Sequence, residues 1–234
     1  MLRNLVHIHQ TAELAERVLL PGDPGRALRL AQELLESPKM LNHNRGLWGY
    51  TGTAPDGEPL SIQSTGMGGP SAAIVTTELI ELGARRLLRI GTCGGLAPGL
   101  ELGRLLVVDP ALADDGASRA LGGHAALGPV VAPGTLTDAL LSAGGWIGAQ
   151  PPAPVVSADL FYDGDDRVPD WIAAGAVAVE MEAATVFTVA ARHGVEAGCA
   201  LLVSDIVATK QRIEPDALHS AELALGRLAI AALS

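Results

Sequence analysis

Short apolar runs alternate with longer amphipathic stretches along most of this chain, and each kind predicts a different element. The apolar runs predict buried strands at residues 17–20, 59–64, 87–90, 105–108, 177–179 and 200–203. Helical periodicity, together with Gly and Pro at the expected helix ends, predicts helices at residues 26–35, 71–82, 182–193 and 215–233. This alternation indicates an α/β fold, in which helices flank a mixed, mostly parallel central sheet.

The stretch from residue 111 to residue 154 breaks the alternation. It is rich in Gly, Ala and Pro, and its pattern places neither strands nor helices. No charged or Ser-rich tract bounds it, so we expect an insertion inside a domain rather than a linker between two domains. Residues 1–234 are therefore expected to form a single domain.

Composition narrows the class of protein that this domain represents. Of its 234 residues, 48% are hydrophobic, which suits one sizeable core. The net charge of −10 argues against nucleic acids and anionic membranes as partners, because both bind basic surfaces. No apolar run approaches the roughly 20 residues of a membrane span, and the first residues lack the apolar core of a signal peptide. We expect a soluble, cytoplasmic protein.

Residues with functional chemistry follow several of the predicted strands, and the carboxyl ends of parallel strands share the sheet edge where ligands bind. Gly22 and Arg26 follow the first strand, in a turn that suits a phosphate at a helix start but also an ordinary surface Arg. The glycine-rich residues 66–71 lack the spacing of a dinucleotide fingerprint. They predict a tight turn that brings backbone close to a ligand.

Arg89 lies inside an apolar run that we expect to stop at the glycine-rich residues 91–95. A buried Arg needs a negatively charged partner. That partner is either an internal carboxylate, such as Glu182, or a bound oxyanion that Thr92 and glycine amides also contact. Cys93 and Cys199 are too few for a disulfide scaffold and lack the spacing of metal ligands, so we expect no metal site. We expect Cys93 to be a small buried residue rather than a nucleophile.

Carboxylates follow two further strands. Glu180 and Glu182 stand at a strand-to-helix junction, where they either favour the helix N-terminus or bind the vicinal hydroxyls of a sugar. Ser204 and Asp205 follow the predicted strand at 200–203. There Asp205 is either a general acid or part of an ordinary helix N-cap.

Taken in order, these segments resemble the hexameric nucleoside phosphorylase family, which includes bacterial purine nucleoside phosphorylases and uridine phosphorylases. The matching motifs are specific and cover most of the chain: residues 20–24 with Arg26, 44–46, 64–71, 89–92, 157–162, 179–183 and 203–205. The resemblance implies a pentosyltransferase that cleaves a nucleoside with inorganic phosphate as co-substrate and uses no metal or organic cofactor. It also implies a homo-hexamer, a trimer of dimers, whose active sites are shared between subunits.

The resemblance implies a role for each matched residue. The implied phosphate ligands are Gly22, Arg26, Arg89, Thr92 and, from a neighbouring subunit, Arg45. The implied ribose ligands are Met67, Met181, Glu182 and, from the neighbour, His7, with His9 as an alternative. The implied base-binding residues are Phe161, Val179, Glu180, Ser204 and Arg167. Asp205 is the implied catalytic acid, which protonates N7 of a purine base.

The resemblance leaves two bases to choose between. Purine enzymes of the family usually carry an Arg on the final helix, but residues 214–226 contain none, so Arg212 or Lys210 would replace it. Residues 161–167 resemble the uridine branch, where Arg167 would grip uracil and Asp165 stands in place of a Gln. Asp205 favours a purine, because a pyrimidine has no N7. We therefore expect a purine nucleoside phosphorylase. The alternatives are a uridine phosphorylase, a phosphate-independent nucleosidase and a nucleoside-binding module.

Overall fold

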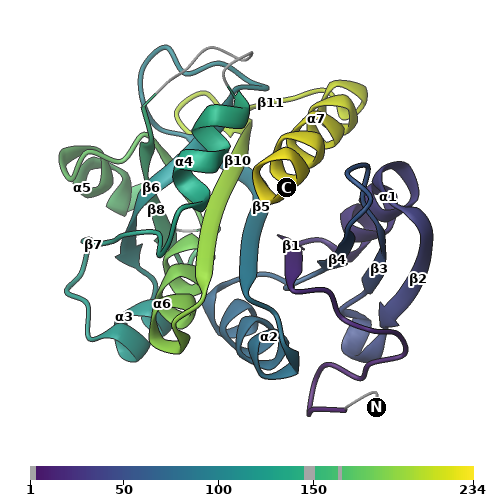
Figure 1. The fold of residues 1–234 in the computed structure, drawn as a ribbon. Helices are drawn as coiled ribbons and strands as arrows, with labels where there is room; N and C mark the ends of the chain where they lie inside the picture. The colour runs from purple at the N-terminus through teal and green to yellow at the C-terminus, as the bar shows by residue number, and fades with distance from the viewer. Residues whose placement is uncertain (1–3, 145–150, 163–164) are drawn as a thin grey trace.

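A computed structural model describes residues 4–144, 151–162 and 165–234. Within these residues, 11 strands form one sheet in the order β11-β10-β6-β8-β9-β5-β1-β4-β3-β2, with β7 paired to β6 (Figure 1). The strands are β1 Arg17–Pro21, β2 Glu36–Asn42, β3 Gly49–Thr53, β4 Pro59–Gln63, β5 Arg86–Gly95, β6 Leu105–Asp114, β7 Gly128–Val130, β8 Ala153–Ala158, β9 Ala178–Glu180, β10 Glu196–Ile206 and β11 Gln211–Arg212.

The sheet is mixed, as expected from the sequence, and part of it closes on itself. Strand β1 runs parallel to β4 and β5, β5 runs parallel to β10, and β8 runs parallel to β6 and β9. Antiparallel pairings join β10 to β6 and β5 to β9. Because β5 also pairs with β10, the strands β5, β10, β6, β8 and β9 form a closed ring.

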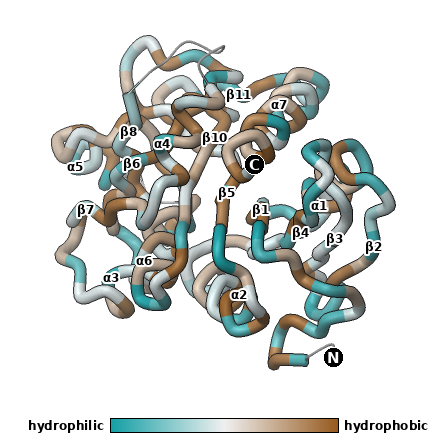
Figure 2. Tube along the Cα trace, viewed as in Figure 1, coloured by the Kyte–Doolittle hydropathy of each residue, from teal (hydrophilic) through white to brown (hydrophobic). Residues whose placement is uncertain are grey.

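Helices cover both faces of the sheet. They are α1 Pro24–Leu34, α2 Gly69–Leu82, α3 Gly116–Gly122, α4 Leu136–Ala143, α5 Val168–Ala173, α6 Ala183–His193 and α7 Pro215–Leu233. Buried side chains of α2 and α6 share one apolar core with the sheet, and those of α1, α4 and α7 share a second core on its other face (Figure 1). Hydrophobic residues in the middle of β5 lie between these cores (Figure 2). No helix in the described part of the chain is long and apolar enough to cross a bilayer.

The strands β5, β6 and β10 are longer than their apolar runs predict. Strand β5 continues through the glycine-rich residues to Gly95, because Gly94 and Gly95 pair with β9 on one side and with β10 on the other. The expectation that this strand stops at residue 91 is wrong. Strand β10 continues to Ile206, so Ser204 and Asp205 lie inside a strand and the helix N-cap interpretation is wrong.

The segment at 111–154 belongs to the same sheet, although its pattern placed no element. It supplies the end of β6, the helices α3 and α4, the short strand β7 and the start of β8. Strand β7 pairs with β6, and β8 lies between β6 and β9. The hairpin of β2 and β3 was also not predicted, because the first five residues of β2 are exposed and form no apolar run.

Candidate active site

A buried ion-pair cluster joins Arg89, in the first half of β5, to the junction where β9 ends and α6 begins. The Nη2 atom of Arg89 lies 2.7 Å from Oε2 of Glu180 and 2.5 Å from Oε2 of Glu182, and Nε donates to Glu180 Oε2 at 2.8 Å. All three side chains are buried. We call Arg89, Glu180 and Glu182 the strand-end cluster. The internal salt bridge to Glu182 that the sequence offered as one alternative is therefore present.

The local sequence explains why each member of the cluster takes its place. The Arg89 side chain extends over Gly91, where a Cβ atom would lie only 3.0 Å from Nη2. The carboxylate of Glu180 accepts the N–H groups of Glu182 and Ala183 and so satisfies free donors at the start of α6. Ser157 of β8 donates its hydroxyl to the same carboxylate. Glycine and the helix N-terminus thus make a buried charged cluster possible.

One donor group of the cluster is unpaired. Among the described residues, Nη1 of Arg89 is a buried donor without a hydrogen-bond partner. Burial alone would lower the pKa of Arg89, but the carboxylates of Glu182 and Glu180 raise it above its ordinary value. Burial raises the pKa of Glu182, and the Arg89 guanidinium opposes that rise. The guanidinium is therefore firmly charged, and its Nη1 group is left without a partner among the described residues.

Asp205 lies beside the cluster, on the neighbouring strand. A bulge in β10 after Val203 brings Asp205 opposite Gly94 of β5, where a Cβ atom would lie 3.0 Å from Oδ2. A Cβ atom at Gly94 would also lie 3.4 Å from Cγ1 of Val179. The predicted acid and a predicted base-binding residue therefore both lie next to Gly94. The Ser204 hydroxyl donates to Oδ1 of Asp205 at 3.0 Å.

The cation expected near Asp205 is found on β11 rather than on the final helix. Strand β11 pairs antiparallel with β10, and Arg212 lies directly across from Asp205. Lys210 lies in the intervening turn with a left-handed φ of 57°. The register thus favours Arg212 over Lys210 as the neighbour of Asp205. An assisting role for Arg212 stays a prediction.

The glycine-rich turns connect the first strand to the cluster. The N–H of Gly66 donates to the carbonyl of Gly22 at 3.0 Å, so the turn after β1 is bound to the turn after β4. The N–H of Gly68, two residues further, donates to Oε1 of Glu182 at 2.5 Å. Met67 between them is 84% exposed, and Met181 is half-buried next to Glu182. Two predicted ribose ligands therefore lie on segments that contact or adjoin Glu182.

Arg26 and Thr92 occupy separate positions around this site. Arg26 lies in the first turn of α1, and its Nε donates to Oε1 of Glu222 on α7 at 2.7 Å. Thr92 is half-buried in β5 and pairs with Leu202 of β10. Arg26 follows the end of β1, and Thr92 lies in the parallel neighbour β5, two residues beyond Ile90, which pairs with the last residue of β1. Their binding of phosphate stays a prediction.

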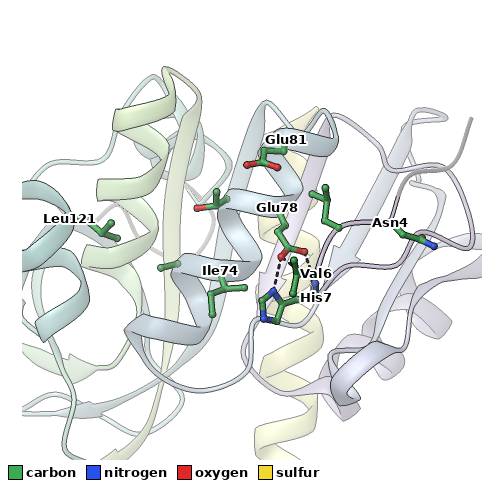
Figure 3. A pocket seen from close by; sticks show the side chains of 10 residues that line it. Asn4, Val6, His7, Ile74, Glu78, Glu81 and Leu121 are labelled. Atoms are coloured by element: carbon green, nitrogen blue, oxygen red, sulfur yellow. Dashed lines mark hydrogen bonds and ion pairs between the residues drawn. The ribbon is translucent and has the colours of Figure 1, made fainter.

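His7 and Arg45 lie together on a different surface, which we call the N-terminal face: residues 4–9, the turn 44–46 and the outer side of α2. Nδ1 of His7 lies 2.6 Å from Oε1 of Glu78, whose other oxygen accepts the N–H of Ile8 at 2.7 Å (Figure 3). Asn44, the neighbour of Arg45, donates to the His7 carbonyl at 3.1 Å. Neither His7 nor Arg45 contacts the strand-end cluster within the described part of the chain.

A groove of about 690 Å³ runs along the N-terminal face, away from the strand-end cluster (Figure 3). Its walls include exposed Val6 and Ile74 together with Leu121 of α3. Exposed apolar surface of this kind often marks a site that binds a ligand or another protein. The N-terminal face is therefore a candidate contact surface.

The predicted base-binding residues divide into two groups. Val179 and Ser204 lie near Asp205, whereas Phe161 is 66% exposed and packs edge-to-face on Tyr162 with ring centroids 5.0 Å apart. Arg167 donates from Nη2 to Oδ1 of Asp114 at 2.9 Å. Asp163, Gly164 and the side chain of Asp165 lie outside the described residues.

Several residues that support the site were not predicted. Ser157 and the N–H of Gly68 hold the two glutamates, Glu78 holds His7, and Glu222 holds Arg26. Burial raises the pKa of the Cys93 thiol, which agrees with a structural rather than a nucleophilic role. Within the described ranges, no group of three or more His, Cys, Asp or Glu residues is placed to hold a metal ion.

Comparison with known proteins identifies the family. The model of the phosphorylase superfamily matches residues 16–233. A protein of Geobacillus kaustophilus (strain HTA426) named purine nucleoside phosphorylase DeoD-type is 38% identical over 211 residues, which cover 87% of each chain. A protein of the same name from Clostridium perfringens is 35% identical over 209 residues, 88% of each chain. The chain belongs to the phosphorylase superfamily, and the resemblance found in its motifs is confirmed at this level.

Proposed function

We propose that this protein is a purine nucleoside phosphorylase, a pentosyltransferase that converts a purine nucleoside and inorganic phosphate into the free base and ribose 1-phosphate. The observation that carries the proposal is the strand-end cluster with Asp205 beside it. A charged Arg89 with a free donor suits a phosphate, and a buried carboxylate suits a sugar diol. The names of the relatives support a purine as the base.

The proposed reaction assigns each group a step. Arg89, Arg26, Thr92 and Gly22 hold the phosphate against the anomeric carbon, while Glu182 fixes the ribose hydroxyls with Met181 and Met67 beside it. A phosphate oxygen bonds to C1′ as the bond from C1′ to N9 breaks, and the electron pair leaves with the base. Asp205 gives a proton to N7, which neutralises the leaving base. Phe161, Val179 and Ser204 line the base, whereas the carboxylate of Glu180, which was expected to join them, is bound to Arg89 and Ser157.

The proposal extends to a homo-hexamer built as a trimer of dimers, in which each site takes His7 and Arg45 from the partner subunit. The support is their position on the N-terminal face, beside the groove and exposed Val6 and Ile74. His7 and Arg45 lie apart from the strand-end cluster of their own chain. They can take part in the reaction only if a second copy of the chain packs against the N-terminal face and brings its own cluster close to them. A cytoplasmic location belongs to the proposal, and cell fractionation tests it.

The position of Arg167 bears on the choice of base. Its guanidinium is paired with Asp114, and Trp171 donates to the other oxygen of the same carboxylate at 2.7 Å. Asp114 thus engages one of the five N–H groups of Arg167. The choice of a purine rests on Asp205 and on the names of the relatives.

Nucleoside cleavage by the purified protein tests this function. Inosine, adenosine and uridine are each incubated with and without inorganic phosphate, and the released base and ribose 1-phosphate are measured. The proposal predicts phosphate-dependent release of hypoxanthine or adenine. Release of uracil alone would assign uridine phosphorylase instead, and cleavage that ignores phosphate would assign a nucleosidase. Nucleoside binding without turnover would reduce the protein to a binding module.

A further inference from the structure

Glu222 is a buried carboxylate on an otherwise apolar face of α7. The residues that α7 buries with it are Leu225, Gly226, Leu228, Ala229, Ile230, Ala232 and Leu233. Its two oxygens bind two arginines of α1: Oε1 accepts from Nε of Arg26 at 2.7 Å, and Oε2 accepts from Nη2 of Arg29 at 2.9 Å. A buried charge is tolerated only when it is paired in this way.

Helix packing determines where this carboxylate lies. Gly226 follows Glu222 by one helical turn and faces α1, where a Cβ atom would lie 2.6 Å from Leu34 and 2.9 Å from Leu30. The absence of a side chain at Gly226 therefore lets α7 approach α1 closely. Because the two helices lie close together, the side chain of Glu222 is long enough to reach Arg26.

The contact with Glu222 also determines how Arg26 is oriented. In the described part of the chain, the side-chain hydrogen bond of Arg26 uses Nε, and no bond is made by its two Nη atoms. A guanidinium is planar, so an anchored Nε leaves the opposite edge, with both Nη groups, in a defined direction. That edge is the one that binds an oxyanion with two parallel hydrogen bonds.

We propose that Glu222 is a positioning residue for phosphate, which holds Arg26 by Nε so that its two Nη groups meet the co-substrate. This inference rests on the proposed function, because it needs Arg26 to bind phosphate. The charge of Glu222 does not cancel that of Arg26, since Arg29 supplies a second cation to the same carboxylate. The three side chains together keep a net positive charge at the start of α1.

The test is a pair of variants on the same carboxylate. Glu222→Gln removes the charge that holds Arg26, and we expect the KM for phosphate to rise about tenfold or more while the KM for the nucleoside stays unchanged. Arg29→Lys keeps the second cation beside Glu222, and we expect the KM for phosphate to stay within about threefold of the parent. Calorimetric titration with inorganic phosphate gives the same comparison without turnover.

The outcomes separate this inference from the function on which it rests. A folded Glu222→Gln variant with an unchanged or lower KM for phosphate overturns the positioning role, as does an equal rise in both KM values. A purely structural role would lower the amount of active enzyme and leave both KM values alone. Should Glu222→Gln fail to fold, Glu222→Asp keeps the charge but shortens its reach, and it carries the same expectation. A parent protein that cleaves nucleosides without phosphate overturns the proposed function itself.

Discussion

The strand-end cluster and the N-terminal face carry residues proposed for one reaction, yet they are built in different ways. In the cluster, Arg89 is buried and contacts both Glu180 and Glu182, which come from a segment about ninety positions along the chain. On the N-terminal face, His7 is held by Glu78 of the adjacent helix, and exposed apolar side chains surround it. The strand-end cluster finds all its ion-pair partners within one chain, whereas the N-terminal face exposes apolar side chains to solvent.

This difference shows which half of the site the fold of one chain can make. A buried charged group is fixed by the partners that its burial requires, so the cluster is preformed. His7 has an equally definite position, because its Nδ1 lies 2.6 Å from Oε1 of Glu78. It lies apart from the strand-end cluster, so it gains a function in the reaction only if a second copy places a substrate beside it. The predictions below test each region separately.

The largest effect is expected at Asp205. Asp205→Asn removes the acid that protonates the leaving base at N7. We expect kcat for a purine nucleoside to fall about 10²–10⁴-fold. Asp205 is half-buried on β10 and its main neighbour is Ser204, so the free energy of unfolding should change little. Steady-state rates and urea denaturation measure the two quantities. The exposed Glu33→Gln serves as control, and a variant that keeps its full rate would remove Asp205 from the mechanism.

The next largest effect is expected on stability, at the centre of the cluster. Arg89→Met leaves the carboxylates of Glu180 and Glu182 buried without their cation. We expect the free energy of unfolding to fall by about 3–5 kcal/mol, as measured by urea denaturation. Arg119→Met on the surface of α3 should change it by less than about 0.5 kcal/mol. Equal stability of the two variants would mean that the cluster is not an internal support.

On the N-terminal face, Glu78 should contribute stability that depends on pH. Burial alone raises the pKa of Glu78, but hydrogen bonds from His7 and from the N–H of Ile8 hold it below its ordinary value of 4.5. The ionised carboxylate therefore stabilises the fold above that value, and its contribution is lost as pH falls through the folded-state pKa. Glu78→Gln should cost about 1.5–3 kcal/mol at neutral pH.

Thermal or urea unfolding of both proteins from pH 7 down to acid measures this contribution. The difference between Glu78→Gln and the parent should shrink as the solution becomes more acidic than pH 4.5. A difference that stays constant over the whole range would show that the charge of Glu78 is not involved.

The smallest effect is expected for substrate binding by His7. His7→Ala should raise the KM for the nucleoside about fivefold to tenfold, the value of one hydrogen bond, and leave the KM for phosphate unchanged. His9→Ala is the matched control, since the motif places either histidine at this position. A larger effect in the His9 variant would transfer the role to His9.

The sequence predicted the cluster better than it predicted its supports. An Arg within an apolar run must find a negative partner, and an internal carboxylate such as Glu182 was one of the two partners that the sequence left open, beside a bound oxyanion. Glu222 and Arg26 are 196 positions apart, and their contact depends on how closely α7 approaches α1. His7 and Glu78 likewise meet only through packing. Such contacts have no local signal.

Element boundaries failed where the local signal was weak. Glycine is a poor strand former, so residues 91–95 predicted the end of β5 although two neighbouring strands pair with them. The exposed residues of β2 form no apolar run, so the β2–β3 hairpin was missed. The helix α7 was predicted with the bounds that it has, because Pro215 and an uninterrupted apolar periodicity mark its length.

The most direct test of the shared site is to mix one variant from each region. Asp205→Asn inactivates the strand-end site, and a double variant with His7→Ala and Arg45→Ala inactivates the N-terminal face. Dissociating and reassembling the two in equal amounts should restore about a quarter of the parent activity, because half of the dimers are mixed and each mixed dimer has one intact site. Activity no greater than the average of the two variants would contradict a site shared between subunits.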